Sequence, residues 1–85
     1  MASKAQAEAQ KALGNAAFKA KDFTKAIHYY TNAIKADGEN HVYYSNCAAC
    51  FFGLKKWSES ADDAQMCIEL KPTFIKGYIH LAKAS

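Results

Sequence analysis

The sequence predicts an all-α domain built from a repeated pair of helices, and three observations predict this fold class. Seventeen of the 85 residues are alanine, which favours helix, and one proline and four glycines leave few residues for β-turns. When the sequence is aligned with itself at an offset of 34 residues, similar residues coincide, for example Phe18 with Phe52 and Ile34 with Ile68. Apolar residues recur three and four positions apart, which is the spacing of one helix face. We therefore expect a helix-turn-helix solenoid.

The 34-residue period also divides the chain. A chain of 85 residues is long enough for one small domain only, so we expect a single domain over 1–85. Within it, repeat one covers about 7–40 and repeat two about 41–74, and 75–85 form a partial third repeat or a capping helix. Because one repeat cannot bury its apolar face alone, stacking of the repeats supplies the core.

Repeat one is expected to contain two helices. The first ends near Ala20, and Asp22 then caps the second. Gly38 follows the second helix, where a helix end favours a left-handed residue. The apolar face of the first helix carries Ala9, Ala12, Leu13, Ala16 and Ala17. The apolar face of the second helix carries Phe23, Ala26, Ile27, Tyr30, Ala33 and Ile34.

Repeat two shows the same helical pattern. Its first helix is expected from His41 to Leu54, and its second from about Ser58 to Leu70, where Pro72 ends it. A last helix begins near Thr73 and runs to the end of the chain. The sequence thus predicts two complete repeats plus the first helix of a third.

Composition disfavours several classes of partner. All eleven cationic residues are lysines, and they are dispersed along the sequence. A protein that recognises nucleic acid normally uses the bidentate guanidinium group of arginine, so we expect no nucleic-acid partner. The longest uncharged stretch, residues 41–54, is too short and too polar to span a bilayer, and we expect no membrane partner. Three cysteines, an odd number, without secretory features indicate free thiols in the cytoplasm.

No pattern of catalytic or metal-binding residues emerges. Cys47 and Cys50 have the spacing of a zinc or redox pair, but Cys47 and Cys67 occupy small packing positions, where a thiol acts as a compact apolar group. Asp62 and Asp63 are adjacent, so a helix points them about 100° apart, and we interpret both as solvated on the outer face. We expect no enzyme activity, no metal and no cofactor.

The 34-residue unit resembles the tetratricopeptide repeat. Repeat one matches the packing positions of that family with Leu13, Gly14, Ala26, Tyr30 and Ala33. Repeat two matches with Ala48, Phe51, Cys67 and Pro72, whereas Ser60 and Ala64 replace the usual alanine and aromatic residue. The resemblance implies that the first helix of each repeat lines a concave groove and that the second forms the outer layer.

Five polar residues fall on the helices expected to line the groove: Lys11, Asn15, Asn46, Lys76 and His80. Lys11 and Asn15 are four residues apart, as are Lys76 and His80, and this spacing places each pair on one helix face. The set comprises two ammonium groups, two carboxamides and an imidazole, with no carboxylate among the five. Its natural ligand is an anion, most simply a carboxylate held by charge-assisted hydrogen bonds.

These positions resemble the carboxylate clamp of tetratricopeptide co-chaperones, which bind the Glu-Glu-Val-Asp tails of cytosolic heat-shock chaperones. The family has an arginine where this chain has His80. The runs 40–46 and 70–78 look like the first such domain of Hsp-organising proteins. The resemblance implies a non-enzymatic adaptor for these C-terminal tails, with Ala49 in the peptide groove.

Other interpretations stay open. Lysines on a helix face are commonly only solvated, and asparagines commonly bond to loop backbone. The chain could instead be a structural module, or a scaffold without a clamp, that associates with a second copy through the exposed end of the truncated third repeat. An adaptor is monomeric and needs the free terminal carboxylate of its peptide, whereas a self-association module is oligomeric and indifferent to such peptides.

Overall fold

The computed structural model describes residues 4–84, which form helices joined by short loops. The helices are α1 (Lys4–Lys19), α2 (Phe23–Ala36), α3 (His41–Gly53), α4 (Trp57–Leu70) and α5 (Ile75–Ala84). The expected all-α fold, with two helix pairs and the first helix of a third, is confirmed. Where both were given, the observed boundary lies within two residues of the expected one, a difference that is common at fraying helix ends. The expected end of the last helix, at the end of the chain, lies outside the described residues. None of these helices is long and apolar enough to cross a membrane.

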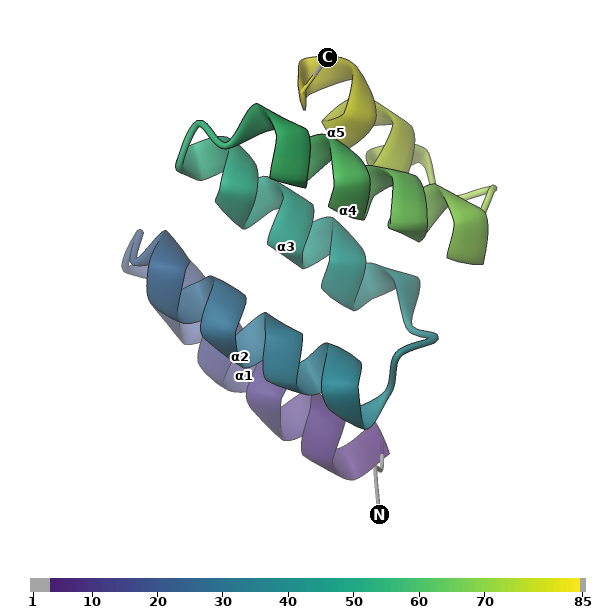
Figure 1. Ribbon diagram of the computed structural model, residues 1–85. Coiled ribbons are helices and arrows are strands. Elements are labelled where there is room, and N and C mark those ends of the chain that lie inside the picture. Colours follow the sequence, from purple (N-terminus) through teal and green to yellow (C-terminus); the bar gives the residue numbers. More distant parts are fainter. Residues whose placement is uncertain (1–3, 85) are drawn as a thin grey trace.

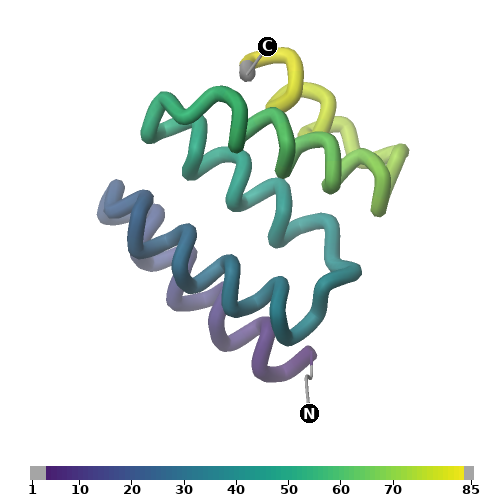
Figure 2. Tube along the Cα trace, viewed as in Figure 1, coloured from purple at the N-terminus to yellow at the C-terminus, as the bar shows by residue number. Residues whose placement is uncertain are grey.

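The helices stack in chain order, each packed against the next (Figure 1). Helices α1 and α2 form one pair and α3 and α4 the second, while α5 packs on α4 and also contacts α3. The tube in Figure 2 shows that the two ends of the chain lie at opposite ends of this stack. The shortest dimension of the molecule, 16 Å, corresponds to two layers of helices, since packed helix axes lie about 8–10 Å apart.

Each repeat joins its two helices by the same tight turn. Lys21 and Lys55, which are one repeat apart, both adopt the left-handed conformation with φ of 61°. The N–H of Asp22 donates to the carbonyl of Ala17, and the N–H of Lys56 donates to the carbonyl of the equivalent Phe51, both at 2.9 Å. These bonds form a Schellman C-cap, in which a lysine takes the position usually given to glycine.

The expected left-handed glycine after α2 is wrong. No described glycine has a positive φ, and α2 ends at Asp37 in a more extended conformation with φ −148° and ψ 84°. Lys71, one repeat later, ends α4 in nearly the same way, with φ −145° and ψ 83°. Both residues lead from one repeat to the next, and the extended backbone carries the chain away from the helix before the next helix begins.

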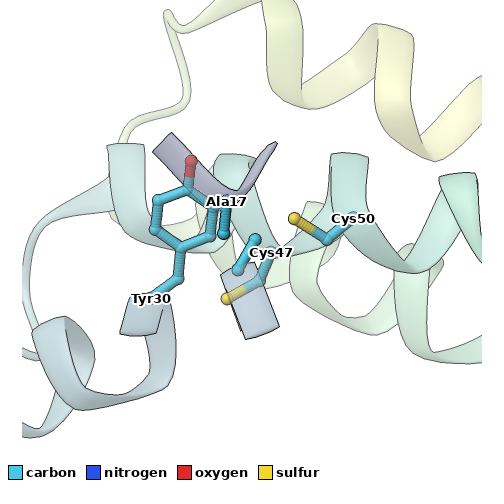
Figure 3. Close-up of a cluster of buried hydrophobic side chains, with 5 residues drawn as sticks. Ala17, Tyr30, Cys47 and Cys50 are labelled. Carbon is cyan, nitrogen blue, oxygen red and sulfur yellow. The ribbon is translucent and has the colours of Figure 1, made fainter. Parts of the chain in front are cut away.

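Close packing of α1 on α2 depends on Gly14. A Cβ atom at this position would lie 2.5 Å from the ring of Tyr30, so any side chain would push the two helices apart. The Tyr30 ring is buried in a core cluster with Ala17, Cys47 and Cys50 (Figure 3). Both cysteines therefore act as compact apolar groups, which the sequence predicted for Cys47 but not for Cys50, and burial raises the pKa of both thiols.

The second helix pair contains a polar residue at a small packing position. Ser60 on α4 is fully buried, and its hydroxyl donates a 2.8 Å hydrogen bond to the backbone carbonyl of Ala48 on α3. A buried hydroxyl without a partner would cost free energy, and this bond removes that cost. The serine that replaces the usual alanine is therefore compatible with close packing of α3 on α4.

Candidate functional site

The five residues predicted from the sequence lie on the first helix of each repeat. Lys11 and Asn15 are on α1, Asn46 is on α3, and α5 carries both Lys76 and His80. Ala49, the expected groove residue, is half-buried on α3, one turn after Asn46.

Lys11 is engaged by a carboxylate of its own helix. Its Nζ lies 3.0 Å from Oε1 of Glu8, one turn earlier. The second carboxylate oxygen of Glu8 accepts a 2.6 Å hydrogen bond from the hydroxyl of Tyr43 on α3. The bond from Tyr43, and then that from Lys11, lowers the pKa of the Glu8 carboxyl group. Glu8 was missed by the sequence analysis, although its i,i+3 spacing from Lys11 is that of a helical ion pair.

The two carboxamides have different surroundings. The Oδ1 atom of Asn15 accepts a 2.6 Å hydrogen bond from the hydroxyl of Tyr30. Burial raises the pKa of Tyr30 to about 12, so this hydroxyl remains a donor at neutral pH. The bond uses the oxygen of Asn15 and leaves its NH₂ group for a ligand. Asn46 is half-buried, and its side chain makes no hydrogen bond within the described part of the chain.

On α5, Lys76 and His80 lie close enough to interact electrostatically. Burial lowers the pKa of the His80 imidazole below its usual 6.5, and the charges of Lys83 and Lys76 lower it further. Lys83 is a cation that the sequence analysis did not include, although it is three residues from His80 on the same helix. Its Nζ lies 5.8 Å from the centre of the Phe52 ring, which links the end of α5 to α3.

A cavity of about 270 Å³ adjoins Lys11. It is lined by Lys4, Glu8, Lys11, Asp37, Asn40, Val42 and Tyr43. Of the five predicted residues only Lys11 lines this cavity, and its other charged groups are of both signs. The geometry brings Lys11 to α3 through Glu8 and brings Lys76 near His80. That all five donors face one ligand remains a prediction.

The expectation that both aspartates of α4 are solvated is wrong for Asp63. Asp62 is exposed, whereas Asp63 is half-buried, and its charge acts on Tyr44 and Cys47 of α3. Burial, with a smaller contribution from Asp62, raises the pKa of Asp63 to about 6. Asp63 is three residues after buried Ser60, so its position on the helix places it beside the face that packs on α3.

Comparison with protein families and relatives gives a consistent result. A family model described as tetratricopeptide repeat matches residues 7–40. Heat shock protein STI1 of Saccharomyces cerevisiae is 47% identical over 79 residues, which are 92% of this chain and 13% of that protein. The chain therefore spans a small part of the curated relatives that it matches.

Solved structures extend the likeness over nearly the whole chain. The second TPR of Spaghetti (RPAP3), bound to the HSP90 peptide SRMEEVD, superposes with a TM-score of 0.93 at 32% identity and covers 95% of this chain and 75% of its own. The TPR2B domain of yeast Sti1, in a pHsp70 complex, gives a TM-score of 0.91 at 34% identity, over 93% and 63% of the two chains.

Proposed function

Because this chain belongs to the tetratricopeptide repeat family and is homologous to STI1-type co-chaperones, we propose that it is a non-enzymatic adaptor for acidic C-terminal peptides of heat-shock chaperones. The ligand is the Glu-Glu-Val-Asp type of tail. The proposed binding residues are Lys11, Asn15, Asn46, Lys76 and His80, with Ala49 in the groove. We place the adaptor in the cytoplasm with these chaperones.

The observation that carries the proposal is the likeness to a domain bound to such a peptide. The RPAP3 domain holds a peptide ending in Glu-Glu-Val-Asp, and its fold superposes on 95% of this chain. The chemistry of the predicted residues agrees with this ligand. Ammonium groups and carboxamide NH₂ groups are donors that suit a terminal carboxylate, and charged hydrogen bonds are the stronger kind.

The proposal is tested by removing one donor from each of two helices. A hydrogen bond to a charged group contributes about 1.5–3 kcal/mol. Lys11→Ala and Asn46→Ala should therefore each weaken binding of a free-acid Met-Glu-Glu-Val-Asp peptide by about tenfold or more. Isothermal titration calorimetry measures the affinity, and circular dichroism checks that the helices remain.

The matched control is Lys35→Ala. Lys35 is exposed on α2, the second helix of its repeat, so this variant loses the same charge away from the proposed site. It should bind as the parent does. If Lys11→Ala and Asn46→Ala also bind as the parent does, the assignment of the clamp is wrong.

A further inference from the structure

The ammonium of Lys11 already holds a carboxylate. Glu8 Oε1 lies 3.0 Å from Lys11 Nζ, which is the contact that a ligand carboxylate would make with this donor. Within residues 4–84, Lys11 is the one proposed donor that is paired with an acidic side chain. The internal carboxylate therefore stands in the position of the ligand with respect to Lys11.

Glu8 is held at this place from two sides. While Lys11 binds one carboxylate oxygen, the hydroxyl of Tyr43 donates to the other at 2.6 Å. Tyr43 is buried, with 1% of its surface exposed, so this hydroxyl is fixed in the core of the domain. The side chain of Glu8 is 54% exposed and that of Lys11 29%. Water therefore reaches the pair and weakens it, so Glu8 is restrained by Tyr43 but can be separated from Lys11.

We propose that Glu8 is a specificity-determining residue, an internal competitor that lowers the affinity of the site for carboxylate ligands. This inference rests on the proposed function of Lys11 as a ligand donor. A ligand carboxylate either displaces Glu8 from Lys11 or shares the ammonium with it. If the two carboxylates share the ammonium, each has one oxygen about 3 Å from the tetrahedral Nζ of Lys11. These two oxygens then lie about 5 Å from each other. Like charges so close repel, so both routes weaken binding.

The competitor also changes the charge of the proposed site. Lys11 and Lys76 contribute two positive charges and Glu8 removes one, which leaves +1 while His80 is neutral. The five donors by themselves, without Glu8, would carry +2. A ligand with one free terminal carboxylate therefore meets a weaker field than the donor set alone suggests.

The test is Glu8→Gln, with the free-acid Met-Glu-Glu-Val-Asp peptide as the probe. A glutamine keeps one carbonyl oxygen as acceptor for Tyr43, whereas the charge is lost and an NH₂ donor replaces the oxygen that faces Lys11. We expect affinity to increase about three- to tenfold at low salt, and the gain to shrink at about 0.3 M salt, where the Debye length is short. The matched control is Glu59→Gln, which removes the same charge from an exposed position at the start of α4 and should leave the affinity unchanged.

The outcomes separate this inference from the function on which it rests. Stronger binding by Glu8→Gln alone supports the competitor. If the parent binds the peptide, Lys11→Ala weakens binding, and Glu8→Gln binds equally well or less well, the competitor is refuted and the function stands. An equal gain for Glu59→Gln refutes it as well, because net charge then explains the effect. If neither the parent nor Glu8→Gln binds, both proposals fail.

Discussion

His80 occupies the position at which the carboxylate clamp of tetratricopeptide co-chaperones has an arginine, and its environment favours the neutral imidazole. Burial lowers the pKa of the imidazole, and Lys83 and Lys76 lower it further, so at neutral pH it carries little charge. A neutral imidazole offers one N–H donor, whereas an arginine offers a charged fork of five. At this residue the proposed site therefore offers fewer donors than the family pattern implies.

This leads to a prediction on pH. A bound carboxylate should raise the pKa of His80, so that the complex takes up a proton, and the affinity of the parent should rise as pH falls from about 7.5 to about 6. His80→Arg should bind about three- to tenfold more tightly at neutral pH and lose this dependence. Calorimetric titrations at several pH values measure both effects.

His28→Arg is the matched control, since His28 is exposed on α2. It should keep the affinity and the pH profile of the parent. A parent affinity that does not change with pH, together with no gain from His80→Arg, would remove His80 from the site and leave four donors.

At the residue scale, the sequence predicts which helix carries each donor, but not the hydrogen bonds and ion pairs that the donor side chains make. Helical spacing was sufficient to place Lys76 near His80. The partner of Glu8 on α3 lies 35 residues away in the chain, and no local pattern predicts a contact that depends on how α1 and α3 pack. The hydrogen bond from Tyr30 to Asn15 could not be predicted either, because it depends on the close packing of α2 on α1 at Gly14.

At the scale of the helices, the 34-residue period predicted the elements well because the backbone itself repeats. The left-handed residues recur at Lys21 and Lys55, and the helix-ending conformations recur at Asp37 and Lys71. The expectation of a left-handed residue at Gly38 was wrong, because the left-handed residues lie in the turn within each repeat rather than between repeats. The burial of Asp63 was missed because two adjacent aspartates suggested a solvated face.

Asp63 should therefore oppose the packing of α4 on α3 at neutral pH. Its pKa is raised from 3.8 to about 6 in the folded state, so the folded protein binds more protons than the unfolded chain between these values. The free energy of unfolding should fall as pH rises through this window. Asp63→Asn removes that effect and should stabilise the protein at neutral pH by about 1–2 kcal/mol, below the full equivalent of the shift because water partly screens the group.

Urea unfolding at about pH 4.5 and at neutral pH measures this effect. Asp63→Asn should unfold at a higher urea midpoint than the parent at neutral pH, with a smaller difference in acid. The control is Glu69→Gln, an exposed acid on the same helix, which should change the midpoint little. An Asp63→Asn variant no more stable than the parent at neutral pH would show that the carboxylate is well solvated.

At the scale of the whole molecule, two features suggest different functions. The likeness to peptide-bound domains supports an adaptor. The last helix, α5, exposes three large apolar side chains, Ile75, Tyr78 and Ile79, and the alternative of self-association would use this face. The sequence predicted the stacked fold, but the apolar side chains of α5 alone do not say what covers this face.

The most direct test of the adaptor is titration of the parent chain with one peptide, Met-Glu-Glu-Val-Asp, in free-acid and in amidated form. Amidation removes the terminal carboxylate and leaves the side chains unchanged. If the chain is an adaptor of this kind, a monomeric chain should bind the free acid saturably and the amide at least about tenfold more weakly, since charged hydrogen bonds to that carboxylate are lost. Equal affinity for the two forms, or no binding of either, would contradict it.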